Sequence, residues 1–318
     1  MSQASLISLA CDSAASLSGQ DLEKYPNIVI KPAEIIWNDM QTEDLNDSVA
    51  RSLFSKNAEI IPATSGIIQN QKWNWTDFLV NHSVENDAIF IFLPNTVIYP
   101  NELDNAVAST MKLKTHFIDF FRKHDRKTGK IKHFVVNSGN VFGGIGLLLW
   151  QCQEFLLRMD PNKNLSLLQL KEVFERYSNR TKSILIMDNS AINKALKNKL
   201  SDPGLKNKLT AKLQRKQWLS VSLKKDDIDI GEQTSLEAQI VQHLSQLATV
   251  IEDQRMAFPR ILISCSTQQW DYISSLEIFK LLGRYIEGTK IKLMHQQLSI
   301  SAQILTGKNA IHISYSHK

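Results

Sequence analysis

Short apolar segments alternate with longer segments of helical spacing along the whole chain, and this alternation constrains the fold more than any other feature. The apolar segments of the first half show too little polar alternation for half-exposed strands, so they predict strands buried on both faces. Buried strands that alternate with helices are typical of a mainly parallel sheet covered on both sides. The predicted strands here are residues 5–10, 27–31, 88–93 and 131–136, and the predicted helices are residues 43–55, 73–82 and 101–123.

The second half of the chain continues this alternation but ends differently. A helical pattern over residues 143–180 breaks at Asp160-Pro161-Asn162, which predicts domains of residues 1–160 and 161–318. Near the end, three predicted strands follow one another, and Thr306 to Asn309 have the composition of a hairpin turn. We therefore expect an α/β protein whose second domain is mixed, with some antiparallel strands. Its predicted elements are strands 183–187, 218–223, 260–265, 290–295, 299–305 and 310–316, and helices 235–254 and 272–287.

Length and composition agree with a two-domain globular protein. The chain has 318 residues, 43% of them hydrophobic and 22% charged, which excludes wholesale disorder and suits two domains. Its three cysteines are widely spaced and fit a reducing compartment rather than a disulfide framework. No apolar run reaches the ~18–20 residues of a membrane span, so we expect a cytoplasmic protein.

The sequence contains no pattern typical of a catalytic, metal or cofactor site. The eight histidines have no metal-binding spacing, and Gly143 to Gly146 lacks the lysine of a phosphate-binding loop. Ser65 does not stand in a nucleophile elbow, and nothing places a nucleophile beside a base. We therefore expect no catalytic residue, no metal and no cofactor, and we do not expect an enzyme.

Three segments place hydroxyl or amide groups just beyond an apolar stretch: residues 11–17, 62–66 and 136–146. Ligands of open α/β sheets bind outside the carboxyl ends of the strands, and hydroxyls and backbone N–H groups at helix starts suit anions. The same residue types also make ordinary turns and helix caps, and composition alone favours that simpler interpretation.

In their order and spacing, the three segments resemble the DegV family of fatty-acid-binding proteins. Residues 12–17 (DSAASL) are similar to the family's Asp-Ser-x-x-x-Leu motif, with Ser16 at the place of its second Asp. Residues 62–65 (PATS) match its Pro-x-Thr-Ser motif, and residues 137–147 are similar to its Asp-Ser … Gly-x-Gly stretch. The resemblance covers most of residues 5–160. Further along, Leu305 stands where the family has a His, and residues 189–192 replace its Gly-Gly-Arg-Ile segment.

The resemblance implies a non-enzymatic carrier that binds a long-chain fatty acid, or a similar acyl lipid, in a tunnel between its two α/β domains. Carried over by position, Thr64 and Thr96 would bind the carboxylate. Ser65 and the backbone N–H groups of Ser138 and Gly139 would support them. Several family members present an acyl chain to a fatty acid kinase, which makes such a kinase a candidate partner.

The tail of the ligand would lie along two apolar helices, residues 142–157 and 272–287. Ile278, Phe279 and Leu282 are the expected contacts in the second helix, although their spacing fits an ordinary core face equally well. Burial of the tail would dominate the affinity, and the hydroxyl groups would mainly orient the ligand.

Two basic segments, residues 122–132 and 194–225, leave a second function open. Such segments are usually solvated helix faces, but they also suit an anionic membrane surface. Nucleic acid ranks below a membrane because no aromatic residues interleave the charges. The alternative is therefore an interaction protein that keeps the fold, lacks the ligand, and docks to an anionic partner through its basic surface.

Overall fold

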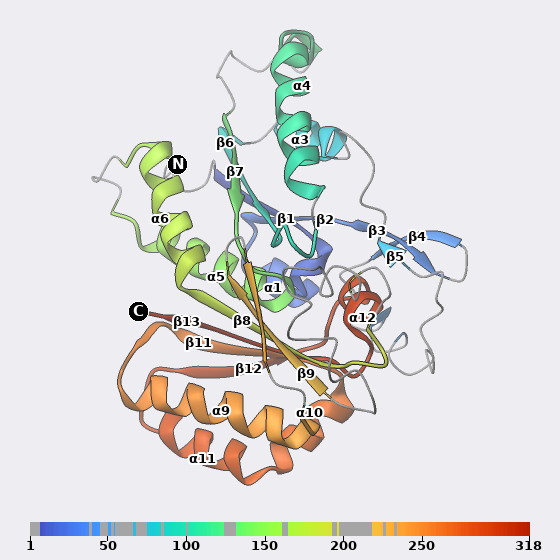
Figure 1. Ribbon diagram of the computed structural model, residues 1–318. Helices are drawn as coiled ribbons and strands as arrows, with labels where there is room; N and C mark the ends of the chain where they lie inside the picture. Colours follow the sequence, from blue (N-terminus) through green and yellow to red (C-terminus); the bar gives the residue numbers. More distant parts are fainter. Residues whose placement is uncertain are drawn as a thin grey trace.

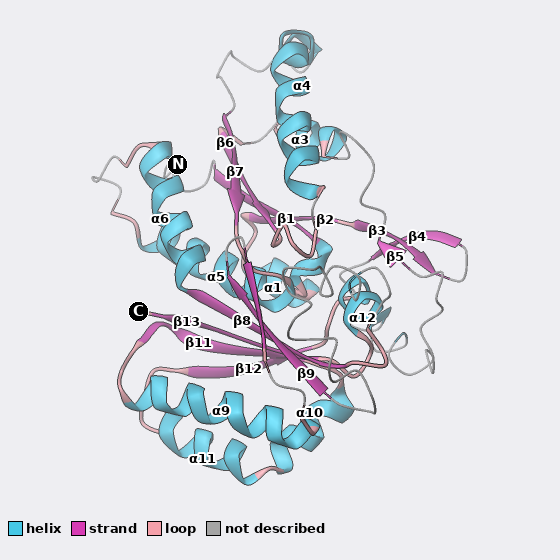
Figure 2. Cartoon of the chain, in the orientation of Figure 1, coloured by secondary structure: helices cyan, strands magenta, loops and turns pink. Residues whose placement is uncertain are grey.

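The computed structural model describes residues 7–37, 40–44, 50–51, 54, 66–67, 75–83, 86–99, 101–123, 132–160, 165–192, 196, 218–224, 227–231 and 234–318 of the chain. Two main sheets lie one above the other with a helix, α5 (Phe142–Arg158), between them (Figure 1). Helices cover both sides of the amino-terminal sheet and the outer side of the carboxyl-terminal sheet (Figure 2).

The amino-terminal sheet has four parallel strands in the order β2-β1-β6-β7. Phe90 and Phe92 of β6 pack toward α5 and α6, while Ile89 and Ile91 pack toward α3 and α4. Burial on both faces explains why these strands lack polar alternation in the sequence. The bounds are β1 (Ile7–Asp12), β2 (Ile28–Lys31), β6 (Ala88–Leu93), β7 (Lys132–Asn137), α3 (Thr76–His82), α4 (Glu102–Lys123) and α6 (Leu167–Arg180).

The carboxyl-terminal sheet has six strands in the order β10-β9-β8-β13-β11-β12. Its neighbours are antiparallel except β11 and β12, which are parallel, so the predicted mixed sheet is confirmed. The outer face packs on α9, α10 and α11. The bounds are β8 (Thr181–Asp188), β9 (Trp218–Lys224), β10 (Asp227–Ile230), β11 (Met256–Ser264), β12 (Lys292–Gln296), β13 (Ile311–His317), α9 (Leu236–Glu252), α10 (Thr267–Ser275) and α11 (Glu277–Ile286).

Helix α5 forms part of the core of both sheets. It is apolar on nearly every side, as expected of a fully buried helix, and it contacts β1 as well as β8, β11 and β13. Arg260 of β11 joins the layers: it pairs with Glu154, donates to the Tyr25 hydroxyl at 3.0 Å, and lies 5.4 Å from the Trp150 ring centre. The division of the chain into domains 1–160 and 161–318 stays a prediction.

Residues 299–305 form a helix, α12 (Ile300–Thr306), and the predicted strand there is wrong. Every side chain of this helix is buried, so no polar face alternates with an apolar one. The sequence therefore lacks the helical period that would have identified the helix. Ser299 begins the helix by accepting from the Ala302 N–H. Gly307 ends the helix at φ 89°. The predicted hairpin turn is therefore a connection from α12 to β13.

Two further differences lie outside the main predicted pattern. An antiparallel sheet of β3 (Ala33–Trp37), β4 (Met40–Asp44) and β5 (Gly66–Ile67) extends from the first sheet, and β4 takes the start of the predicted helix 43–55. The predicted helix 272–287 is divided between α10 and α11, because Leu276 has extended backbone angles.

Candidate functional site

The strand order places a topological switch point between β1 and β6. The chain leaves β1 toward β2 on one side, and the later strands β6 and β7 add on the other side. In open α/β sheets the loops at such a point diverge, and ligands bind at this carboxyl edge. Asp12 ends β1, Thr96 stands in the turn after β6, and Ser138 follows β7.

The loop after β1 is held by its own side chains. Asp12 accepts from the Ala14 N–H at 3.1 Å and caps a short 3-10 helix, η2 (Ser13–Ala15). Ser13 accepts from the Ala33 N–H at 2.9 Å, which fixes the start of β3. Ser16, in the left-handed region at φ 56°, accepts from the Ser299 N–H at 3.2 Å. The segment that resembles the DegV motif thus contacts the start of α12 in the second half.

Three buried carboxylates gather beside this loop. Asp12, Glu102 and Asp44 are each at most 5% exposed, and charge repulsion couples Asp12 to both of the others. Glu102 accepts from the Trp75 indole N–H at 2.6 Å. Asp44 accepts from the backbone N–H groups of Ile300 and Ser301 at the start of α12, at 3.2 and 2.9 Å.

Burial shifts the titration of the two aspartates and of a neighbouring tyrosine. Desolvation, with the Glu102 charge next, raises the pKa of Asp12 to about 7, against the opposing effect of Lys31. Desolvation likewise raises the pKa of Asp44, although the Ser301 hydroxyl and Arg51 oppose it. Tyr99 is 2% exposed, and burial together with the three carboxylates raises the pKa of its hydroxyl well above the usual range.

The loops after β6 and β7 are joined to each other. Asn95 donates its backbone N–H to the Asn140 carbonyl at 2.8 Å and its side-chain amide to the Gly139 carbonyl at 3.2 Å. Thr96, half-buried, stands next to Asn95. The loops that carry Thr96 and Gly139 are therefore neighbours, and the joint role of Thr96, Ser138 and Gly139 in binding stays a prediction. Thr64 and Ser65, the other predicted binding residues, lie outside the described residues.

The backbone donors expected at Ser138 and Gly139 are engaged within the protein. The Ser138 N–H donates to the Leu93 carbonyl at 3.0 Å, and the Gly139 N–H donates to the Asn137 side chain at 3.1 Å. Both residues are buried, and the Ser138 hydroxyl also donates to the Leu93 carbonyl. A ligand could use these N–H groups only by replacing an existing bond, and their predicted role in binding stays a prediction.

The glycines of α5 permit close packing of the helix against both layers. A Cβ on Gly144 would lie 1.9 Å from the Ser183 hydroxyl of β8, and one on Gly146 would lie 2.8 Å from the Ala15 carbonyl of η2. The Gly143 N–H donates to Nδ1 of His312 in β13 at 3.1 Å. Burial lowers the pKa of His312 to about 3, so the ring is neutral and serves as an acceptor at neutral pH.

The position where the resembled family has a His belongs to an apolar cluster here. Leu305 of α12 is 7% exposed and packs in one cluster with Ile98, Tyr99 and Phe142. This environment explains how the chain accommodates an apolar side chain there.

The two predicted tail-lining helices lie on opposite faces of the six-stranded sheet. Helix α5 covers the inner face, whereas Ile278, Phe279 and Leu282 of α11 pack with α9 in the outer cluster. These three side chains therefore form the ordinary core face that their spacing also allowed, and their predicted contact with a shared tail is wrong.

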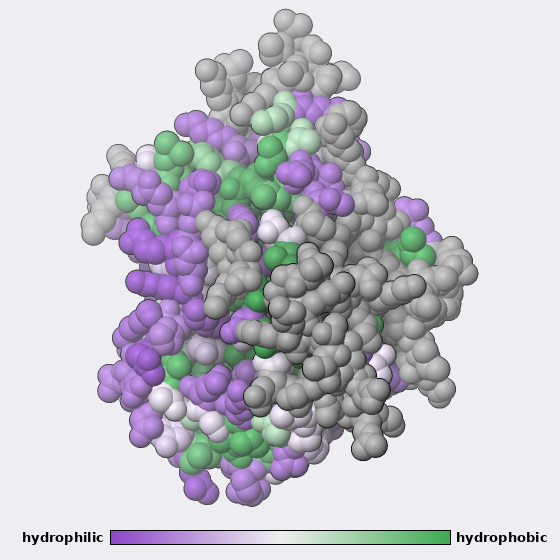
Figure 3. All heavy atoms as spheres, viewed as in Figure 1, coloured by the Kyte–Doolittle hydropathy of each residue, from purple (hydrophilic) through white to green (hydrophobic). Residues whose placement is uncertain are grey.

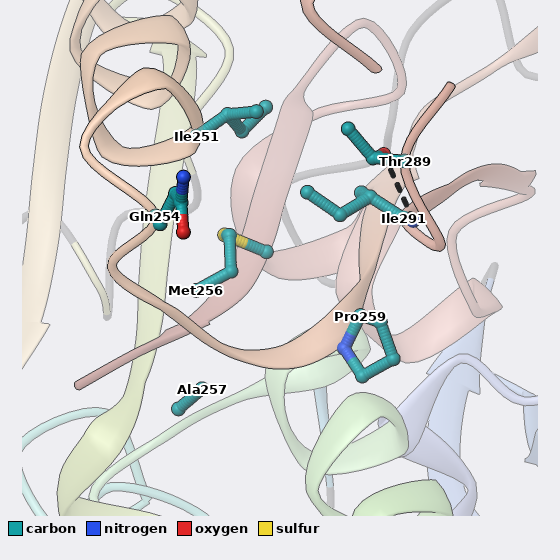
Figure 4. Close-up of a pocket in the computed structure, with 7 residues that line it drawn as sticks. All are labelled: Ile251, Gln254, Met256, Ala257, Pro259, Thr289 and Ile291. Atoms are coloured by element: carbon teal, nitrogen blue, oxygen red, sulfur yellow. Dashed lines mark hydrogen bonds between the residues drawn. The ribbon is translucent and has the colours of Figure 1, made fainter. Parts of the chain in front are cut away.

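A separate hollow of about 350 Å³ opens at the other end of β11 from Ser264. In Figure 4 its side chains come from the end of α9, the start of β11 and the loop before β12. The lining carries no charged side chain, and the Ile291 N–H donates to the Thr289 hydroxyl within it. Its lining residues are Ile251, Gln254, Met256, Ala257, Pro259, Thr289 and Ile291.

Sequence reasoning missed most of the carboxylate cluster. Glu102 lies within the predicted helix 101–123 and Asp44 within the predicted helix 43–55, and neither position carries a motif. Asp12 was part of a recognised motif. Within the described ranges, no group of His, Cys, Asp or Glu has metal-binding geometry, and no helix has the length and apolar character needed to span a bilayer.

No family model matches the chain, and no curated protein sequence matches it. Solved structures do match over nearly the whole length. DegV of Bacillus subtilis, described as a fatty acid binding protein, has a TM-score of 0.74 at 12% identity, with 98% of this chain and 99% of that chain covered. A fatty-acid-binding DegV family protein of Thermus thermophilus has a TM-score of 0.68 at 15% identity, with the same coverage.

A third similar structure is the fatty acid kinase B3 protein of Streptococcus pneumoniae, loaded with linoleic acid. Its TM-score is 0.67 at 12% identity, again over 98% of this chain and 99% of that chain. At these identities the likeness shows the fold. The chain therefore has the two-sheet α/β fold of DegV proteins, and the resemblance seen in its motifs is confirmed at that level.

Proposed function

We propose that this chain binds a long-chain fatty acid or a similar acyl lipid as a non-enzymatic carrier. The observation that carries the proposal is the likeness of the whole fold to proteins described as binding fatty acids, over 98% of this chain. The polar loops at the switch point between β1 and β6 support it, because this is the usual ligand position in open α/β sheets. The tunnel would run between domains 1–160 and 161–318, near the contact of η2 with α12.

In this proposal the hydroxyl groups of Thr64, Ser65 and Thr96 orient the head group, while Ser138 and Gly139 shape the loop behind them. Burial of a tail at about 0.8 kcal/mol per CH₂ supplies most of the affinity. A single hydroxyl contributes about 1 kcal/mol, so its loss should weaken binding only about fivefold.

Native mass spectrometry of the full chain purified from bacteria tests the proposal. We expect a long-chain lipid to remain bound, and we expect the lipid-free protein to take up added oleate. Thr96→Val should weaken oleate binding about fivefold. Thr249→Val, at an exposed hydroxyl on α9, is the matched control and should leave it unchanged. A protein that carries no lipid and takes up no oleate would exclude the carrier function.

A second candidate is an interaction protein that keeps this fold without a ligand. The packing of Leu305 into an apolar cluster favours it, because the carboxylate-binding His implied by the resemblance is absent. Its docking surface would be the basic segments 122–132 and 194–225, most of which lie outside the described residues. This candidate predicts a partner whose affinity falls steeply with salt and is unaffected by oleate.

The proposed setting is the cytoplasm, with a fatty acid kinase or an anionic membrane surface as partner. The likeness to the fatty acid kinase B3 protein of Streptococcus pneumoniae supports the first partner. A pull-down with such a kinase, with and without bound oleate, distinguishes lipid-dependent docking from docking to the protein surface alone.

A further inference from the structure

Asn95, which immediately precedes Thr96, is completely buried and makes the bonds that shape the turn after β6. Its carbonyl accepts from the N–H groups of Ile98 and Tyr99, at 3.1 and 2.9 Å, which closes one helical turn. Its side-chain oxygen accepts from the Val97 N–H at 2.9 Å, the bond that defines an Asx turn. Thr96 is therefore enclosed in the chain between groups that the same residue holds in place.

Asn95 also ties this turn to the loop after β7. Its backbone N–H donates to the Asn140 carbonyl at 2.8 Å, and its side-chain nitrogen donates to the Gly139 carbonyl at 3.2 Å. The side-chain oxygen of Asn140 in turn accepts from the Ser183 hydroxyl of β8 at 2.8 Å. The turn that carries Thr96 is therefore connected through two asparagines to the six-stranded sheet as well as to its own sheet.

The hydroxyl of Thr96 follows the backbone of this turn. A threonine is branched at Cβ, so few χ1 positions remain for the side chain once the turn fixes the backbone angles. Thr96 is half-buried, so part of it stays open to a ligand, whereas Asn95 is completely buried. A hydroxyl that is oriented before the ligand arrives loses little conformational freedom on binding, which favours affinity.

We infer that Asn95 is the positioning residue for the head group: it acts on binding through the direction of the Thr96 hydroxyl and does not touch the ligand. This inference rests on the proposed carrier function and deepens it. Its consequence is specific, because a substitution at Asn95 should change lipid affinity only while Thr96 keeps its hydroxyl.

A double-mutant cycle between Asn95 and Thr96 tests this dependence. Asn95→Ala removes the side-chain bonds to Val97 and Gly139, and oleate binding to the lipid-free full chain is measured by calorimetry. We expect Asn95→Ala to weaken oleate binding about fivefold, as Thr96→Val does. The double variant should also lose only about fivefold, because a misdirected hydroxyl and an absent one are equivalent to the ligand. Independent effects would instead multiply to about 25-fold.

A conservative variant separates the turn from the link between the loops. The hydroxyl of Asn95→Ser still accepts from the Val97 N–H, as serine does in such turns, but it is too short to reach the Gly139 carbonyl. Asn95→Ser should therefore bind oleate within about twofold of the unchanged chain.

Asn86→Ala is the matched control at the other end of the same sheet. Asn86 also donates to a backbone carbonyl, that of His82 at 2.8 Å, and accepts from a side chain, the Ser8 hydroxyl at 2.8 Å. Its replacement should lower the midpoint of thermal unfolding, as Asn95→Ala does, and leave oleate affinity unchanged.

The outcomes are distinct. An unchanged affinity in Asn95→Ala, a loss of about 25-fold in the double variant, or no recovery in Asn95→Ser would overturn the inference and leave the carrier function intact. An equal loss in Asn86→Ala would do the same, since it would mark general destabilisation as the cause. If Asn95→Ala fails to fold, Asn95→Gly runs the same cycle, because glycine is better tolerated than alanine at a helix cap. Failure of the unchanged chain to bind oleate would remove the carrier function itself, and this inference with it.

Discussion

Two buried titratable side chains, His312 and Asp12, differ in the groups that surround them. The Phe142 ring stands between the two regions, 6.0 Å from the His312 ring and 6.4 Å from the Tyr99 ring. His312 faces neutral groups: the Gly143 N–H at one ring nitrogen and the Ser314 hydroxyl, 3.3 Å away, at the other. Asp12 faces other carboxylates.

Burial disfavours the charged form in both regions, but the consequences are opposite. His312 has a lowered pKa and is neutral and hydrogen-bonded at neutral pH. Asp12 has a raised pKa, and the nearby Tyr99 hydroxyl lacks a partner among the described residues. The Ser264 hydroxyl beside His312 also has no hydrogen-bond partner among the described residues, so an unpartnered hydroxyl does not separate the two regions. They differ instead in the charge of the groups that act on the buried side chain. Hydrophilic and apolar side chains also mix over the outer helices, so the visible surface offers no comparable contrast (Figure 3).

Replacement of His312 by Asn should have the largest effect on pH dependence. The unfolded chain binds a proton at His312 below about pH 6.5, whereas the folded chain does so only near pH 3. Stability is therefore lost as pH falls through this interval, by at most about 5 kcal/mol. In His312→Asn this acid-induced loss should shrink, as measured by urea unfolding at a series of pH values. An unchanged slope would show that His312 is not the group responsible.

Asp12→Asn should remove a loss of stability that occurs as pH rises, whereas His312→Asn removes one that occurs as pH falls. The expected change in the free energy of unfolding is slightly smaller. A carboxyl with a pKa near 3.8 when unfolded and about 7 when folded destabilises the protein as pH rises between these values. The loss is at most about 4 kcal/mol and is complete above about pH 7. Asp12→Asn keeps an acceptor for the Ala14 N–H, so it should raise the free energy of unfolding at about pH 8. A lower value there would show that the ionised form is needed for folding.

The sequence predicts the fold well where burial leaves a clear pattern. The strands of the four-stranded sheet could be found because apolar runs of that length have few alternatives. Helix α12 could not, because complete burial of residues 300–306 removed the helical period. The carboxylate cluster was equally hidden, since Glu102 and Asp44 meet Asp12 only through contacts between elements distant in sequence.

The glycines of α5 are another case in which the sequence alone does not reveal the structural role. In the sequence, the segment 136–146 that contains them also suits an anion site, whereas the structure shows these glycines in close packing contacts. Gly146→Ala should cost about 1–3 kcal/mol, because its Cβ would meet the backbone carbonyl of Ala15 at 2.8 Å. Gly283→Ala in α11 is the matched control: nothing lies within 4 Å of its Cβ, so helix propensity should stabilise it by about 0.5–1 kcal/mol. Equal effects in thermal unfolding would contradict close packing as the cause.

The smallest expected effect concerns the contact between Asp44 and Ser301, which joins β4 to the start of α12. The Ser301 hydroxyl donates to Asp44 and lowers its pKa, against the dominant effect of burial. Ser301→Ala removes this bond to a buried carboxylate and should reduce the free energy of unfolding by about 1–2 kcal/mol at neutral pH. The loss should diminish in acid, because a protonated Asp44 gains less from the donor. Ser275→Ala removes an exposed hydroxyl that donates to the Tyr272 carbonyl, and it should change stability little at any pH. A loss in Ser301→Ala that does not vary with pH would mean that packing of α12, and not the charge of Asp44, holds this contact.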